Sequence, residues 1–163
     1  MKKIITMLLG VVLADQITKG FLLHTVTGTW HWFGDAMTIV PNPYMMARVT
    51  DWFNIVFTWN PGTSFSLFRT APQMMMIILT GTIIAALMYR LFKNVDEWRE
   101  VVAMSLIVGG ALGNLIDRIR FGAVIDFIDW HAWGVHWPAF NIADACICMG
   151  VGLYIWYFIR NRR

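Results

Sequence analysis

Residues 70–89 read TAPQMMMIILTGTIIAALMY and carry no charged side chain. A helix needs about 20 mostly apolar residues to cross the hydrocarbon layer of a bilayer, and this stretch has that length. The composition of the whole chain agrees, because 58% of its 163 residues are hydrophobic and only 14% are charged. Soluble domains are about 25% charged. The sequence therefore predicts a membrane protein.

Three other windows could also span a bilayer, and the last two of them, at residues 101–116 and 141–159, become long enough once their polar ends are included. We predict helices over about residues 4–23, 70–92, 99–117 and 141–159, joined by outer segments at about 24–69 and 118–140. Residues 2–14 imitate a secretory signal, but the apolar pattern resumes through Leu23, which favours a retained helix. Residues 50–60 are rich in β-branched and aromatic side chains and predict a strand, whereas residues 130–138 are expected to form a loop. The expected fold is an all-α four-helix transmembrane bundle in a single domain, residues 1–163, with a small β ribbon or sheet on the outer membrane surface.

Lysine and arginine are distributed unevenly about these four spans. One side of the membrane would receive Lys2, Lys3, Arg90, Lys93, Arg99, Arg160, Arg162 and Arg163. The other side would receive Arg48, Arg69, Arg118 and Arg120. Because cytoplasmic loops and ends carry the excess of positive charge, we predict that both termini are cytoplasmic. The net charge of +3 therefore reflects membrane topology, and no nucleic-acid partner is expected.

Polar residues that a bilayer disfavours converge on the outer half of this topology. They are Asp15, Asn60, Asn114, Asp117, Arg118, Asp126, Asn141 and Asp144. Ionisable groups in or beside a membrane mark functional sites by default. Asp126 and Asp144 together suggest acid/base chemistry, because two neighbouring carboxylates that share one proton can activate water directly.

Several of these groups also have a structural interpretation. Asp15 and Lys19 are four residues apart on one helix face and are expected to form a structural ion pair, which could also border the site. Asp117 and Arg118 are expected to support the helix end, and Asp129 is a possible decoy for Asp126. The carboxylate of Asp144 also suits the first turn of a helix.

Other chemistries find little support in the sequence. The serines after Gly62 lack the Gly-x-Ser-x-Gly pattern of a nucleophile elbow. The four histidines show no ligand-like spacing, so a metal is not expected, although His131 and His136 could in principle join Asp126 or Asp129 as ligands. No other cofactor is expected. The small-residue tract 109–113 is interpreted as a surface for close helix packing.

Five segments in order resemble bacterial lipoprotein signal peptidase, also called signal peptidase II, an intramembrane aspartyl peptidase. The segments are DQITK at 15–19, NPGTSFS at 60–66, GGALGNLIDR at 109–118, VIDF at 124–127 and PAFNIAD at 138–144. Any one of them would be weak, but five in the family's order reach from the first predicted helix to the last. Thr63 and Ser64 stand where many members have alanine, a mild departure.

The resemblance implies that Asp126 and Asp144 are the catalytic dyad. It also implies a pocket formed by Asp15, Lys19, Asn60, Gly62, Asn114, Arg118 and Asn141, with Asp117 as structural support. The implied reaction is cleavage of diacylglyceryl-modified prolipoproteins just before the lipidated cysteine. The enzyme would act as a monomer among the lipids of the bacterial inner membrane, with its active site on the outer, periplasmic face. The alternative from the residues alone is a small proton-coupled transporter subunit, because intramembrane carboxylates also mark ion pathways.

Overall fold

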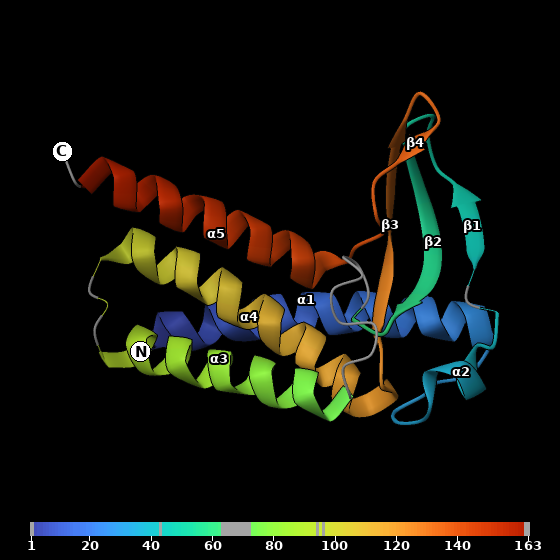
Figure 1. Cartoon of the computed structure of the whole chain (residues 1–163), viewed down its shortest axis with the longest axis horizontal. Helices are drawn as coiled ribbons and strands as arrows, with labels where there is room; N and C mark the ends of the chain where they lie inside the picture. The colour runs from blue at the N-terminus through green and yellow to red at the C-terminus, as the bar shows by residue number, and fades with distance from the viewer. Residues whose placement is uncertain (1, 43, 63–72, 94, 96, 162–163) are drawn as a thin grey trace. The chain divides into compact units, whose positions relative to one another are not determined.

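The computed structural model describes residues 2–42, 44–62, 73–93, 95 and 97–161. Four long helices are present, as predicted: α1 (Lys2–Thr27), α3 (Gln73–Lys93), α4 (Trp98–Phe121) and α5 (Ile142–Asn161) (Figure 1). Each is long and apolar enough to cross a membrane. Predictions for residues 63–66 and 70–72, and for Arg69, Arg162 and Arg163, lie outside the described residues.

The contacts of the chain group into two compact units. The first comprises Met1–Gln16, Ile78–Leu115 and Ile142–Arg163. Its core contains Ile4, Leu8, Ile84, Leu91, Val101, Met104 and Val108. Small residues let its helices approach closely, because a Cβ added to Gly110 would lie 2.4 Å from the carbonyl oxygen of Ala143 and one added to Gly109 2.8 Å from the Cβ of Val11. The predicted packing role of this glycine-rich tract is therefore confirmed.

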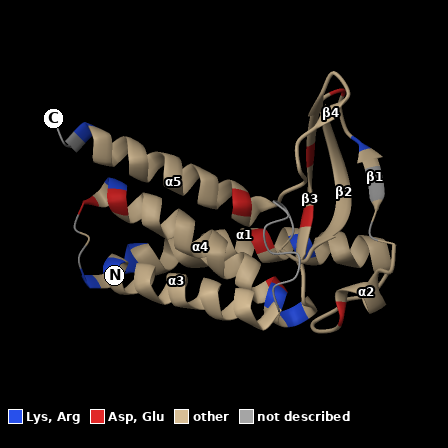
Figure 2. Cartoon of the chain, viewed as in Figure 1, with Lys and Arg blue, Asp and Glu red and all other residues tan. Residues whose placement is uncertain are grey.

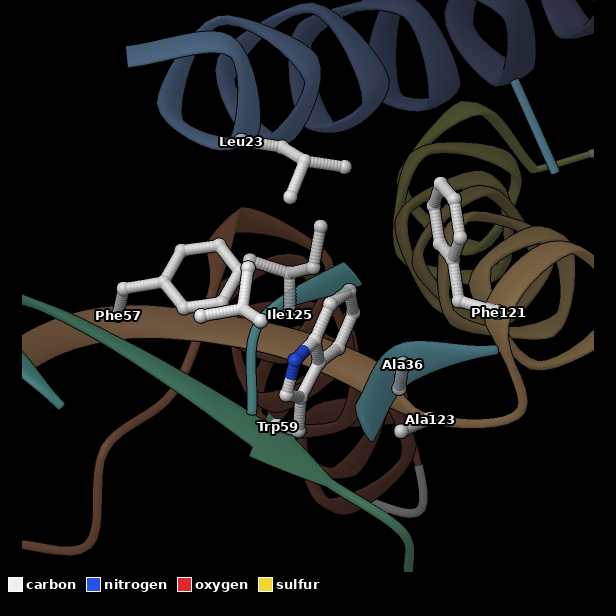
Figure 3. Packing of buried hydrophobic residues seen from close by; sticks show 8 residues of the cluster. Leu23, Ala36, Phe57, Trp59, Phe121, Ala123 and Ile125 are labelled. Atoms are coloured by element: carbon white, nitrogen blue, oxygen red, sulfur yellow. The ribbon is translucent and has the colours of Figure 1, made fainter. Parts of the chain in front are cut away.

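The second unit comprises Ile17–Ile77 and Ile116–Asn141 and is built around an antiparallel sheet. Its strands are β1 (Met45–Arg48), β2 (Phe53–Asn60), β3 (Val124–Ala132) and β4 (Val135–His136), in that order across the sheet, and a short helix α2 (Ala36–Ile39) lies within the same unit. Figure 3 shows the apolar core of this unit, with Leu23, Phe57, Trp59, Phe121 and Ile125 directed toward one another. The sheet agrees with the predicted ribbon.

Two of the predicted helices end later than expected. Hydropathy places their boundaries near residues 23 and 117, where polar residues begin, but α1 continues to Thr27 and α4 to Phe121. Each helix stops at a glycine with positive φ, Gly28 at 73° and Gly122 at 83°. Their N–H groups close the last turns on carbonyl oxygens at 2.8 and 3.1 Å, respectively. A left-handed glycine ends a helix whatever the polarity of the residues before it.

The prediction of a loop over residues 130–138 is wrong for residues 130–132 and 135–136, which are in strands. β3 continues to Ala132 and turns into β4, with Ala132 opposite Val135. Trp133 and Gly134, at φ of 51° and 79°, form the two-residue connection. Such a turn matches the twist of the flanking strands, but a tryptophan in it gives no ordinary turn signal.

Candidate active site

Asp126 lies on β3, and both of its carboxylate oxygens accept hydrogen bonds from asparagine amides. The Nδ2 of Asn141 donates to Oδ1 at 2.7 Å, and the Nδ2 of Asn60, at the end of β2, donates to Oδ2 at 2.8 Å. Asp126 is only 1% exposed. Burial of a carboxylate is costly unless its oxygens are bonded, so the two amides make this position tenable.

Gly62 sets the orientation of the Asn60 amide. The Gly62 N–H donates to Oδ1 of Asn60 at 2.9 Å, so the amide nitrogen of Asn60 is directed toward Asp126. Gly62 has a φ of 101°, a conformation that side chains with a Cβ rarely adopt. The glycine that the sequence predicts for the pocket therefore acts through the turn that follows β2.

A buried ion pair contacts the backbone of Ile125, the residue before Asp126. The Nζ of Lys19 is 2.9 Å from Oδ2 of Asp117, and the two side chains are 1% and 0% exposed. The same carboxylate oxygen accepts the N–H of Ile125 at 3.2 Å. Asp117 therefore joins α1 and α4 to the backbone of β3. The predicted pairing of Lys19 with Asp15 stays a prediction.

Asp126 opens onto a cavity of about 360 Å³. Its walls combine polar and apolar side chains from the sheet and from the segments just before and after it: Tyr44, Val56, Thr58, Trp59, Asn60, Asp126, Asp129, His136, Trp137, Pro138 and Ala139. A mostly apolar hollow with a few convergent polar groups is the usual form of a binding site.

Asp129 is the second carboxylate of this cavity, and its surroundings differ from those of Asp126. Asn54 donates to its Oδ2 at 2.8 Å, and the Nδ1–H of His136 donates to its Oδ1 at 2.8 Å. Burial by itself would raise the pKa of Asp129. The hydrogen bonds from Asn54 and His136, with the charges of His136 and His131, nevertheless hold that pKa below its ordinary value. Asp129 is thus an ion-pair partner and a poor candidate for sharing a proton.

Strand geometry explains why two carboxylates three residues apart line one cavity. Strict alternation would place them on opposite faces of β3. The register of β2 and β3 shifts by one residue between Ile55 and Thr58, and such an irregularity bends a strand and redirects its side chains.

In the other compact unit, Asp144 lies in the first turn of α5. Its Oδ1 accepts the Nδ2–H of Asn114, on α4, at 2.7 Å. Both predicted catalytic carboxylates therefore accept hydrogen bonds from asparagine, in two separate groups of residues.

Asp15 supports the start of α5. Its Oδ1 accepts the N–H of Ala143 at 3.0 Å, one of the N–H groups that a helix start leaves without an intrahelical partner. A carboxylate at this end is also favoured by the helix dipole. Gly113 leaves room for the carboxylate, since a Cβ there would lie 2.6 Å from its Oδ2.

Three residues of this site, Tyr44, Asn54 and Thr58, were not identified from the sequence. Of these, only Asn54 could have been noticed, because it is a polar residue four positions before Thr58 and therefore on the same face of a strand. The role of Arg118 was predicted but is not tested. The carbonyl oxygen of Arg118 accepts the amide of Gln73 at 2.8 Å. Its place in the pocket stays a prediction.

Known proteins resemble the chain over most of its length. A family model described as signal peptidase (SPase) II matches residues 7–160. The lipoprotein signal peptidase of Janthinobacterium sp. (strain Marseille) is 43% identical over 153 residues, which cover 92% of this chain and 84% of that protein. The lipoprotein signal peptidase of Anaplasma phagocytophilum (strain HZ) is 46% identical over 116 residues, covering 70% of this chain and 74% of that protein.

A solved structure described as a bacterial membrane enzyme has the same fold. Its TM-score is 0.79 at 30% sequence identity, and the match covers 99% of this chain and 90% of that one. The predicted fold class, four apolar helices with a small antiparallel sheet, is confirmed. Because the matching family model spans nearly the whole chain, this multi-pass membrane protein belongs to the signal peptidase II family, and it is an aspartic-type peptidase.

Proposed function

We propose that this protein is an endopeptidase that cleaves diacylglyceryl-modified prolipoproteins just before the lipidated cysteine, with Asp126 and Asp144 as its catalytic dyad. The observation that carries the proposal is Asp126 itself, a buried carboxylate held by two asparagine amides at the wall of a cavity. The relatives named lipoprotein signal peptidase support the substrate class.

The chemistry follows from two carboxylates that carry one proton between them. The ionised carboxylate takes a proton from water while the water oxygen bonds to the scissile carbonyl carbon. The protonated partner donates its hydrogen to the carbonyl oxygen and stabilises the tetrahedral intermediate. When the C–N bond breaks, the carboxyl group that took the proton from water gives it to the leaving amine, and the other carboxylate takes a proton from a hydroxyl of the intermediate, so the dyad again carries one proton. Every proton in this cycle comes from water or the dyad, so no cofactor is required.

Chain connectivity supports the pairing of these two residues. Asn141 donates to Asp126, and α5 begins at the next residue. Asp144 then follows in the first turn of that helix. The backbone of residues 141–144 is short, so the amide that holds one carboxylate is covalently close to the other.

The remaining predicted site residues are proposed to hold the dyad in place. Asp15 fixes the start of α5, and the Lys19–Asp117 pair fixes the backbone beside Asp126. Gly62 aims the Asn60 amide. Arg118 is proposed to line the substrate pocket.

The distribution of charge supports a definite orientation in the bacterial inner membrane. In the first compact unit, basic residues gather where α1 and α4 begin and where α3 and α5 end (Figure 2). By the positive-inside rule this end is cytoplasmic, with both termini inside and the active site toward the periplasm. There the substrate's lipid would hold the scissile bond at the membrane surface, and such positioning lowers the barrier to reaction. We propose that the monomer contains the complete site.

The test is cleavage of a diacylglyceryl-modified prolipoprotein peptide by purified protein with a chelator present. Asp126→Asn and Asp144→Asn keep the size of the side chain but remove its basicity, so both are expected to fold and to lose turnover. Asp51→Asn is the matched control, because Asp51 is an exposed carboxylate paired with Arg48. Cleavage that persists in either dyad variant would show that the dyad is wrongly assigned. Wild-type protein that folds but does not cleave would favour the transporter alternative.

A further inference from the structure

Asp129 joins three strands of the sheet through its side chain. It lies opposite Asn54 in the register of β2 and β3, and the Asn54 amide bonds to one of its oxygens. His136, on β4, bonds to the other. Asn54 and Asp129 are 3% and 5% exposed, so the bond between them forms away from bulk water and costs more to lose than a surface contact.

The segment after β4 leads directly to the amide that holds Asp126. Trp137 donates its N–H to the carbonyl of Trp130 at 2.7 Å, and the N–H of Phe140 donates to Ile128 at 3.1 Å. Between these two ties stands Pro138, which has no N–H to donate. The next residue after Phe140 is Asn141, whose amide lies 2.7 Å from Asp126. Phe140 also accepts the N–H groups of Ile128 and Phe127 at 2.8 and 3.0 Å, so the position of this amide depends on how the segment is anchored at both of its ends.

We infer that Asp129 and His136 are positioning residues for the peptidase reaction. Their bond anchors β4 against β3, fixes the start of the segment to Asn141, and so keeps the Asn141 amide on the Asp126 carboxylate. This inference rests on the proposed function. It assigns neither residue a place in proton transfer or substrate contact.

The neighbouring histidine, His131, does not bond to Asp129 in the way that His136 does, and it provides a control. His131 is opposite His136 in the β3–β4 register, and their rings stack with centroids 4.8 Å apart. The buried Nε2 of His131 has no hydrogen-bond partner among the described residues. A change at His131 that keeps an aromatic ring should therefore leave the anchor intact.

Three variants separate the hydrogen bond from the ring. His136→Phe keeps a ring beside His131 but removes the donor to Asp129. His136→Asn removes the ring but retains an N–H donor near the position of Nδ1. His131→Phe keeps the stacking and the Asp129–His136 bond. Because the His136 side chain is 50% exposed, its replacement opens no core cavity, and circular-dichroism melting of each variant checks that it folds.

The variants are compared in the prolipoprotein cleavage assay, with kcat and KM determined separately. His136→Phe is expected to lose about 10- to 100-fold in kcat, the scale of a small misplacement of a reacting group, with little change in KM. His136→Asn should recover most of that loss, and His131→Phe should stay close to wild type. If His136→Phe does not fold, His136→Gln, whose amide lies nearer the position of Nε2, takes its place.

Two results would overturn the inference while leaving the proposed function intact. One is a folded His136→Phe protein with wild-type kcat. The other is His136→Asn as slow as His136→Phe, which would show that an N–H donor to Asp129 does not restore turnover. A wild-type protein without activity, or an active Asp126→Asn variant, would instead overturn the proposed function.

Discussion

Replacing Lys19 with Met tests the buried ion pair beneath the site. Lys19 and Asp117 are 2.9 Å apart with side chains 1% and 0% exposed. Removal of one partner of a buried ion pair costs about 3–5 kcal/mol, because the charge that remains loses an interaction that offset its burial. Methionine has nearly the length and apolar bulk of the lysine stem and adapts to irregular spaces. The loss of the charge therefore dominates over any cavity.

The assay is thermal unfolding in detergent, followed by circular dichroism. In a chain of this size about 1 kcal/mol shifts the melting temperature by roughly 2–4 °C, so Lys19→Met should lower it by roughly 6–20 °C. Arg48→Met is the control, because Arg48 and Asp51 form an ion pair with side chains 68% and 77% exposed. Breaking such a surface pair costs less than about 1 kcal/mol.

The double variant Lys19→Met with Asp117→Asn isolates the charge. The asparagine introduced at position 117 carries no charge, yet its side-chain carbonyl oxygen can still accept the N–H of Ile125, which lies 3.2 Å from the Asp117 carboxylate in the wild-type protein. The double variant should therefore melt above Lys19→Met alone. A Lys19→Met protein that melts no lower than Arg48→Met, or a double variant that melts below the single one, would refute the reasoning.

Two further predictions concern packing and pH. Gly113→Ala should lower the melting temperature, because the new Cβ would lie 2.6 Å from an Asp15 oxygen. Gly81→Ala should raise it, because nothing lies within 4 Å of a Cβ there and alanine is the better helix former by about 1 kcal/mol. A Gly113→Ala protein that melts at or above the temperature of Gly81→Ala would contradict the packing argument. Because the folded-state pKa of Asp129 is depressed, the unfolded chain binds more protons and the stability from Asp129 is present above its ordinary pKa of about 4. That stability is lost as pH falls through the lower folded-state pKa, so the difference in melting temperature between wild type and Asp129→Asn should shrink on acidification below pH ~4. A difference in melting temperature that stays constant with pH would rule out this contribution of Asp129.

The sequence determined the parts that depend on local composition. Four apolar runs long enough to cross a bilayer predict four helices whatever their neighbours, because backbone groups in lipid must be satisfied within the segment. The ordered motifs identified Asp126, Asp144 and the asparagines that accompany them as candidates. The ends of α1 and α4 could also have been predicted from the local sequence, because Gly28 and Gly122 follow them. Hydropathy alone placed these ends too early.

Only the tertiary structure decided which of these residues are partners. Asn60 and Asp126 are separated by 66 residues and Asn114 and Asp144 by 30, and no sequence period links positions so far apart. Asp126 and Asp129 line one cavity despite their odd spacing because the register of β2 and β3 shifts between them. Hydrophobic pattern specifies what a segment buries, whereas hydrogen-bond partners follow from strand register and close helix approach, which the whole fold sets together.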